Sequence, residues 1–215
     1  MLRNMLIQIL VDNPKSWVIP YAQELMSILA KKTFEVKLIH SHNEIAKGDI
    51  LILLSCERIL KNLSLNKHNL VVHPSNLPQG KGWSPLTWQI LEGKNEIPIT
   101  LFEATEKVDS GGIYLKDMIY LEGHELVDEV REKQGKKTIE LILKFIDNYP
   151  NNPIIAQQGE SSYYPKRSPQ DSELDIFKTI DEQFNLLRVC DNDRYPAFFV
   201  RNGIKYILRI EKDRS

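Results

Sequence analysis

The sequence predicts an open, mostly parallel, Rossmann-like α/β sheet that is followed by a small C-terminal appendage. Three observations support this prediction. Short apolar runs recur through the first 120 residues, and a helical pattern lies between the first two. The run at 5–11 is apolar almost throughout, which is typical of a strand covered on both faces. Strands and helices that alternate in this way favour a parallel sheet with right-handed crossovers.

The apolar runs give the strands in order. Asp12-Asn13-Pro14 ends the first run, and the Gly-rich turn Val108-Asp109-Ser110-Gly111-Gly112 separates the last two. We expect strands at 5–11, 34–39, 49–55, 69–73, 97–103 and 113–121.

Helices are predicted where apolar residues repeat about every 3.6 positions. The first is expected at 20–31, and the last long one at 124–148, in which Gly135 is a candidate kink. A helix between them opens at Ser84-Pro85, with the serine hydroxyl as its cap and proline in its first turn, and closes at Gly93.

Beyond the long helix, the composition shifts to Pro, Asn, Gln, Ser and Tyr with little periodicity, which is typical of a linker. We therefore expect a catalytic domain at 1–150, a linker at 151–170 and a small C-terminal helix and β-hairpin subdomain at 171–215.

In the C-terminal segment, we expect a helix at 176–188 and two strands joined by Arg201-Asn202-Gly203. Asn-Gly between apolar alternations is a strong hairpin signal. An isolated hairpin is marginal in water, so this one must pack on the main domain or on another subunit.

Composition excludes several classes of function. The 28 Lys+Arg and 29 Asp+Glu residues give a formal charge of -1, so no global positive field exists to hold a nucleic acid. No apolar run approaches the roughly 18–20 residues that span a bilayer, so no membrane partner is expected. Cys56 and Cys190 fit neither a metal-ligand spacing nor a disulfide framework. We expect a cytoplasmic protein without a metal.

Ligands of open α/β sheets bind beyond the carboxyl ends of the strands. The segment 12–17 follows the first strand but lacks the G-x-G-x-x-G loop, which weighs against a nicotinamide-dependent dehydrogenase, and no Walker-type phosphate loop exists.

Two other segments carry groups suited to proton transfer. His73 leaves a buried strand and enters the Pro-braced loop 74–78, and Asp109 lies in a turn whose glycines leave room for a ligand. A carboxylate beside the ring would orient it and raise its proton affinity. Each residue also has a structural alternative, because strand-end histidines are often incidental and Asp before Ser-Gly-Gly often only forms a turn. The pattern alone indicates an α/β enzyme or ligand binder.

Three segments in the same order carry a more specific signal: His73-Pro74-Ser75-Asn76-Leu77-Pro78, Lys81-Gly82-Trp83-Ser84-Pro85 and Val108-Asp109-Ser110-Gly111. Together they resemble the formyltransferases that use 10-formyltetrahydrofolate, and the resemblance covers about residues 50–120. It implies that His73 and Asp109 are catalytic.

The same resemblance implies a folate site. Glu57-Arg58-Ile59-Leu60 is similar to the segment whose backbone holds the pterin ring in the purine-pathway member. The implied folate contacts are Arg58, Leu60, Val108 and Asp109.

Within the family, the sequence is most similar to short enzymes that formylate a UDP- or dTDP-linked amino sugar, including one of the pseudaminic-acid route. The segments Asn13-Pro14-Lys15-Ser16-Trp17, 80–85, 163–169 and Tyr195-Pro196-Ala197 carry this likeness. It implies a homodimer through the C-terminal hairpin. The tail aromatics Tyr195, Phe198, Phe199 and Tyr206 are its candidate contacts, and the alternative is that they cover the domain's own core. A tRNA formyltransferase would be expected to carry a larger C-terminal β-barrel with a basic face. Candidate contacts to a sugar nucleotide are Trp17, Asn76, Lys81, Trp83, Lys166 and Arg167. The alternative is that the tryptophans pack in the core and that the Lys166-Arg167 pair is solvated surface.

One position departs from the family pattern. The catalytic Asn expected before the His is Val71 here. Losing one oxyanion donor typically costs about 2.7–4 kcal/mol of transition-state stabilisation. Either Asn76, Ser75 or a backbone N–H substitutes, or the enzyme is slow or inactive. The alternatives that stay open are a formyltransferase for glycinamide ribonucleotide or a carrier-bound amino acid, and a non-catalytic folate or nucleotide-sugar binder.

Overall fold

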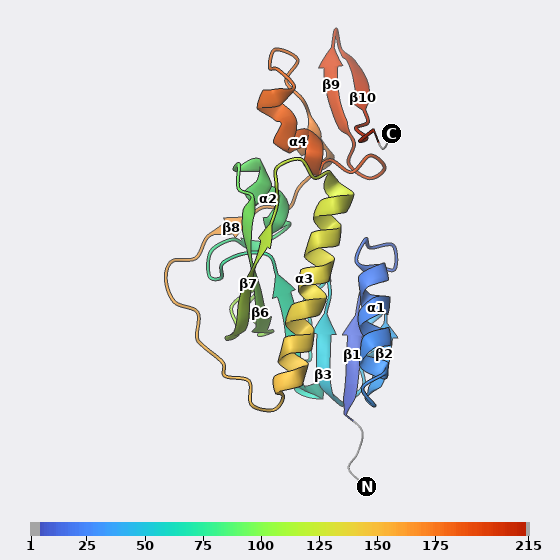
Figure 1. Ribbon diagram of the computed structural model, residues 1–215, viewed down its shortest axis with the longest axis vertical. Coiled ribbons are helices and arrows are strands. Elements are labelled where there is room, and N and C mark those ends of the chain that lie inside the picture. The colour runs from blue at the N-terminus through green and yellow to red at the C-terminus, as the bar shows by residue number, and fades with distance from the viewer. Residues whose placement is uncertain (1–4, 214–215) are drawn as a thin grey trace.

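The computed structural model describes residues 5–213, which fold around a six-stranded sheet (Figure 1). Its strand order is β2-β1-β3-β4-β6-β7. The first four of these strands are parallel, whereas β6 runs antiparallel to β4 and β7 antiparallel to β6. This arrangement confirms the predicted mostly parallel α/β sheet. The strands are β1 (Leu6–Leu10), β2 (Glu35–Ile39), β3 (Gly48–Leu53), β4 (Asn66–His73), β6 (Glu96–Glu103) and β7 (Ile113–Tyr120).

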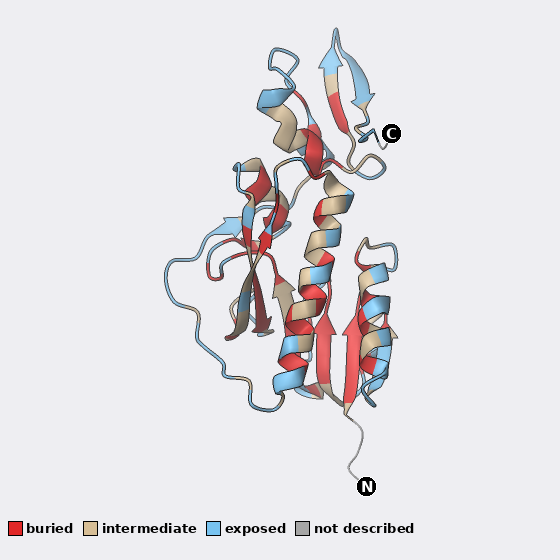
Figure 2. Cartoon of the chain, in the orientation of Figure 1, coloured by how far each residue is buried: buried red, intermediate tan, exposed pale blue. Residues whose placement is uncertain are grey.

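Helices cover one face of this sheet. The helices α1 (Ile19–Ala30) and α3 (Val127–Asn148) lie side by side in front of the strands in Figure 1. Their apolar stripes join the inward residues of the strands in the main core, which Figure 2 shows as buried. The short helix α2 (Pro85–Leu91) follows the site loops.

Loops cover the other face. Leu10, Leu51 and Leu53 pack there against Leu60 in a smaller cluster. The 3-10 turns η1 (His42–Glu44) and η2 (Leu63–Leu65) belong to the same covering. Because side chains alternate along a strand, Val71 and His73 of β4 face this loop side, away from α1 and α3. The face of β4 that carries His73 is therefore covered by loops and not by α1 or α3.

Two expectations about local structure need correction. The helix α3 runs unbroken through Gly135, and the ring of Tyr21 explains the glycine. A Cβ at Gly135 would lie 2.4 Å from Cδ1 of Tyr21, so the glycine permits the close approach of α1 rather than a kink. Ser84 precedes α2 in the left-handed region, with φ 47, and its side chain makes no capping hydrogen bond.

The predicted helix at 176–188 is wrong in its first half. A 3-10 turn, η4 (Asp181–Gln183), leads into a shorter helix, α4 (Phe184–Val189). Upstream, side chains bond local backbone groups: Asp175 accepts from the N–H of Phe177, and Gln183 donates to the carbonyls of 175, 178 and 179. Such local hydrogen bonds compete with the backbone hydrogen bonds of a helix.

The predicted hairpin is confirmed. The strands β9 (Ala197–Arg201) and β10 (Ile204–Leu208) pair antiparallel. Asn202 and Gly203 both have positive φ, 52 and 76, as a two-residue turn of this hand requires. The hairpin shares a small apolar cluster with Leu174, Leu187 and Cys190.

The segment predicted as a linker contacts the catalytic domain. Its short strand β8 (Tyr163–Tyr164) pairs with β5 (Lys81–Gly82), and Ile155 bridges to Ile113. The 3-10 turn η3 (Pro169–Ser172) then leads into the appendage. The boundaries at 150 and 170 stay predictions, and residues 1–4 and 214–215 of the outer two segments lie outside the described residues. Within that described range, no helix is long and apolar enough to cross a membrane.

A buried ion pair joins the appendage to the sheet domain. Arg188 of α4 contacts Glu125 at 3.5 Å, and both side chains are at most 3% exposed. Arg188 also donates to the Asn95 side chain. Burial alone would raise the pKa of Glu125, but hydrogen bonds from Lys133 and from the backbone outweigh it and hold that pKa at about 2.

We expect the substitution Glu125→Gln to lower the free energy of unfolding by roughly 3 kcal/mol at neutral pH. The folded-state pKa of Glu125 lies below its ordinary 4.5. The stabilisation is therefore complete above about pH 4.5 and is lost as the pH falls through about 2. Urea unfolding of the original protein and of Glu125→Gln between pH 3 and 7 measures the difference in their free energies of unfolding. The control is Glu122→Gln, whose side chain is 73% exposed. A difference in the free energy of unfolding that does not decrease as the pH is lowered would contradict this account of Glu125.

Candidate active site

The structure brings together two residues that are distant in sequence, His73 and Asp109. Their side chains approach to 3.9 Å between Nε2 of His73 and Oδ2 of Asp109. His73 ends β4 at the carboxyl edge of the parallel strands, and Asp109 lies in the connection between β6 and β7. Both side chains are largely buried, with 9% and 12% exposed. In a site of this kind, a carboxylate stabilises the protonated ring.

The loop around Asp109 is held in an unusual backbone conformation. Asp109 has φ 48°, a left-handed value that is uncommon for non-glycine residues and that Asp tolerates better than most. Its carboxylate accepts a hydrogen bond from the N–H of Gly82 at 2.9 Å. Gly111 is also required, because a Cβ there would lie 1.6 Å from the carbonyl oxygen of Glu103. The backbone of the protein thus fixes the direction of the carboxylate.

The ring of His73 is oriented by a backbone carbonyl. Nε2 lies 2.8 Å from the oxygen of Gly80, closer than it lies to Asp109. A carbonyl can only accept, so the geometry assigns the proton of the neutral ring to Nε2. Nδ1 then carries the lone pair, and it has no partner within the described residues. This is the nitrogen that can take up a further proton.

Lys81 is a predicted contact that proves to be buried. It is 4% exposed, and its Nζ donates to the hydroxyl of Ser110 at 2.9 Å. The ring of Tyr163 lies 5.9 Å away. Lys81 therefore places its positive charge beside the Asp109 loop.

Asn76 and Val71 flank the histidine. The side-chain oxygen of Asn76 accepts from Lys116 of β7 at 2.7 Å, which leaves its amide nitrogen as a donor. Val71 lies two residues before His73 on the same face of β4 and packs against Leu77 and Phe102. Ser75 has a buried hydroxyl without a partner in the described part of the chain.

The other predicted sugar-nucleotide contacts fall into separate groups. Trp83 is 40% exposed. Nζ of Lys166 lies over its ring, 4.5 Å from the ring centroid. Arg167 points elsewhere, because it donates to the carbonyl of Asp171. Trp17 packs on the main core, with Arg131 lying 5.9 Å over its ring.

The segment predicted to hold the pterin lies at the same edge of the sheet. Asp12, which follows β1, accepts hydrogen bonds from the N–H groups of Glu57 and Arg58. Leu60 is buried in the cluster of the loop face, whereas Val108 is 45% exposed beside Asp109. The backbone N–H of Arg58 is therefore used internally, whereas the described residues show no hydrogen bond to the carbonyl of Arg58 or to the backbone of Leu60.

A thiol nearby is unsuited to nucleophilic chemistry. Burial, helped by the charge of Asp12, raises the pKa of Cys56 to about 12, so the thiol stays protonated at neutral pH. Among residues 5–213, no group of three or more His, Cys, Asp or Glu side chains is arranged to hold a metal ion.

Sequence reasoning missed three residues that shape the site, and it placed a fourth, Asp12, in the segment 12–17 at a carboxyl edge without giving it a role. Lys116, Gln157 and Ser162 carried no signal, because their contacts depend on chain segments that meet only in the fold. Gln157 bonds the Asp109 loop, and Ser162 bonds the Gly80 loop.

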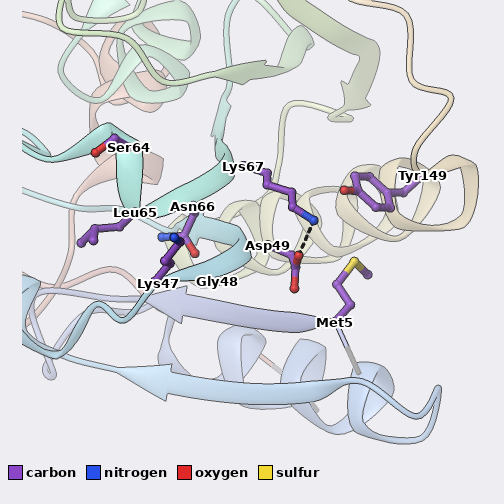
Figure 3. Close-up of a pocket in the computed structure, with 9 residues that line it drawn as sticks. All are labelled: Met5, Lys47, Gly48, Asp49, Ser64, Leu65, Asn66, Lys67 and Tyr149. Atoms are coloured by element: carbon purple, nitrogen blue, oxygen red, sulfur yellow. Dashed lines mark ion pairs between the residues drawn. The ribbon is translucent and has the colours of Figure 1, made fainter. Parts of the chain in front are cut away.

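A hollow of about 430 Å³ lies at the opposite end of the strands (Figure 3). It is lined by residues at the amino ends of β1, β3 and β4, among them the Asp49–Lys67 ion pair, and by Tyr149. Asn66 and His73 bound the two ends of β4, which are about 23 Å apart at the usual rise of a strand. We place the active site at the His73 end, because the groups able to move protons gather there.

An imidazole and a carboxylate that meet at the carboxyl edge of an α/β sheet have the chemistry of a general acid–base pair. A family model described as formyl transferase matches residues 13–146, more than half of the chain. The chain belongs to the formyltransferase family.

Curated relatives and solved structures agree with this assignment. The methionyl-tRNA formyltransferase of Thermosipho melanesiensis is 33% identical over 149 residues, 67% of this chain and 48% of that protein. The chain thus spans about half the length of the first curated relatives it matches.

Three solved structures share the fold. A methionyl-tRNA formyltransferase from Clostridium thermocellum has TM-score 0.82 and 19% identity, covering 98% of this chain and 94% of that one. A sugar N-formyltransferase from a Shewanella species has TM-score 0.71 and 18% identity, covering 98% and 99%. HypX from Aquifex aeolicus, in complex with tetrahydrofolic acid, has TM-score 0.81 and 18% identity, covering 96% and 38%.

Proposed function

We propose that this formyltransferase moves a formyl group from 10-formyltetrahydrofolate to the amine of a nucleotide-linked amino sugar, with His73 and Asp109 as its catalytic pair. The observation that carries the proposal is the 3.9 Å approach of these two side chains at the carboxyl edge of the sheet. The folate would supply the formyl carbon, and a carbon–nitrogen bond to the acceptor would replace the one to the folate.

The proton transfers follow from the ring geometry. The acceptor amine must be neutral to attack, and it must lose a proton as the new bond forms. Nδ1 of His73 would take that proton, while the Asp109 carboxylate would stabilise the resulting imidazolium. The same proton would then pass to the departing folate nitrogen, so the ring would end as it began.

The folate part of the proposal rests on the edge formed by the segment 57–60 and Val108. A solved neighbour, HypX, was obtained with tetrahydrofolic acid. In this chain, Arg58 and Leu60 would offer backbone groups to the pterin, and the exposed Val108 would offer an apolar surface beside Asp109.

The sugar part of the proposal rests on charge and on exposed groups, because a sugar N-formyltransferase and a methionyl-tRNA formyltransferase both share the fold. The stacked pair Trp83–Lys166 lies on the strand pair β5–β8 and offers both a ring and a cation to a nucleotide. In this proposal Lys81 acts on the Asp109 loop, and Trp17, Asn76 and Arg167 stay candidate contacts.

A second acceptor class has an observation in its favour. Sequence relatives described as methionyl-tRNA formyltransferases match two thirds of this chain. A formal charge of -1 speaks against a large nucleic-acid acceptor. We therefore keep methionylated tRNA as the alternative to be tested. The compartment we propose is the cytoplasm, because both cysteines are free thiols.

The experiment that tests the acceptor is a panel of amines assayed by tetrahydrofolate release. The panel contains UDP- and dTDP-linked amino sugars, glycinamide ribonucleotide, a carrier-bound amino acid and methionylated initiator tRNA. We expect turnover with an amino sugar nucleotide. Turnover with tRNA alone would overturn the sugar assignment. Calorimetric binding of folate and sugar nucleotide without any formylated product would indicate a non-catalytic binder.

We expect His73→Ala and Asp109→Asn each to lower kcat by about 10²–10⁴-fold, the usual contribution of a general acid–base group. Asn retains an oxygen that can accept from Gly82, so the fold should persist in the second variant. The matched control is His124→Ala, since this side chain is 60% exposed. Unchanged turnover in either site variant would remove that residue from the mechanism.

Val71 provides a gain-of-function prediction. Its side chain occupies the face of β4 that carries His73, and its packing surface is apolar. Restoring an amide donor with Val71→Asn should raise kcat by up to about 10²-fold, because one oxyanion donor is worth about 10²–10³. Val72→Asn, on the helix-covered face, is the control and should not raise kcat. An unchanged rate in Val71→Asn would mean that another donor already completes the site.

A homodimer through the hairpin is the assembly we propose. Val200, Ile204, Tyr206 and Ile207 are each 39–58% exposed there. We expect sedimentation velocity to reveal a dimer whose fraction grows with concentration, and Ile207→Asp to weaken it. A single monomeric species at every concentration would exclude this interface.

A further inference from the structure

The segment 153–166, which we call the strap, runs from the end of α3 back along the sheet domain to the active site. Figure 1 shows it as a long orange connection that reaches β8. It has little regular structure, yet it bonds the site at two separate points. One point lies on the Asp109 loop, and the other lies on the loop that follows His73.

Gln157 makes the first attachment. Its Nε2 donates to the carbonyl oxygens of Asp109, at 3.0 Å, and of Gly111, at 2.9 Å. Only an N–H₂ group can face two carbonyls in this way, so the orientation of the amide is settled by its partners. The loop it holds contains Asp109, whose backbone is in the left-handed region.

Ser162 makes the second attachment. Its hydroxyl accepts from the N–H of Gly80 at 2.8 Å, and its carbonyl accepts from the N–H of Lys81 at 2.9 Å. The carbonyl of Gly80 is the group that orients Nε2 of His73. One strap therefore bonds the backbone that carries the carboxylate and the backbone that orients the imidazole.

We propose that Gln157 is a positioning residue of the transferase, which holds Asp109 in the place where its carboxylate meets His73 and the N–H of Gly82. The residue acts through Asp109 and touches no reacting atom. Displacing a reacting group by about 1 Å can cost about 10²-fold in rate, so two hydrogen bonds at this loop suffice to matter. The kinetic consequence rests on the proposed function, whereas the structural consequence does not.

Two neighbouring amides report the structural consequence. The N–H of Gly82 bonds the Asp109 carboxylate, and the N–H of Lys81 bonds Ser162 of the strap. If Gln157 positions Asp109, its loss should weaken only the Gly82 bond. If Gln157 merely fastens the strap, both bonds should weaken together.

The test compares Gln157→Met with Gln158→Met by amide hydrogen exchange and by kinetics. Gln158 is the matched control, because its side chain is exposed and makes no hydrogen bond within the described residues. In Gln157→Met, we expect Gly82 to exchange at least tenfold faster while Lys81 stays within twofold of its original rate. We also expect kcat to fall at least tenfold with KM changed less than twofold. Gln158→Met should leave all four quantities unchanged.

Gln157→Glu gives a second, nearly isosteric variant. Its carboxylate would face two carbonyl oxygens, so it should lower kcat and Gly82 protection at least as much as Gln157→Met. Equal loss of protection at Gly82 and Lys81, or a Gln157→Met that behaves like the control, would overturn the proposal. If the unmodified enzyme formylates none of the acceptors, the proposed function fails, and the exchange rates of Gly82 and Lys81 still decide the role of Gln157.

Discussion

The bond between the Asp109 carboxylate and the N–H of Gly82 is the constraint on which the site depends. It joins two loops that leave different strands, and it holds the acid 3.9 Å from the ring of His73. Asp109, which carries this carboxylate, has a left-handed backbone conformation. The carboxylate faces the ring of His73, whose Nε2 is hydrogen-bonded to the carbonyl of Gly80. The protein's own backbone thus organises the pair, and groups fixed in this way lower the cost of developing charge.

The unequal covering of the sheet explains why such a site can exist here. The helices α1 and α3 cover one face with the larger apolar core, so more of the buried apolar surface lies on that side than on the other. The loop face holds a smaller cluster and leaves the carboxyl end of β4 to the catalytic loops. The appendage is fastened by charged contacts, of which the buried Arg188–Glu125 pair is the least exposed.

Periodic signals predicted the framework, and contacts between distant segments escaped them. The strands and the Asn202-Gly203 turn follow from local chemistry, so the sequence was sufficient. The helix at 176–188 was overpredicted because Asp175 and Gln183 bond local backbone groups, which periodicity does not register. His73 and Asp109 could be chosen from strand ends and from the family resemblance. The attachments of Gln157 and Ser162 lie in a segment that pattern alone describes only as a linker.

The most direct measurement is a double-mutant cycle of kcat/KM on His73→Ala, Asp109→Asn and the combined variant, with the acceptor that the enzyme uses. If the two side chains act as one unit, the combined variant should be no slower than the slower single variant, because removing either group already removes the function of both. Losses that multiply in the combined variant would show that the two groups act independently, and would contradict the account of the site.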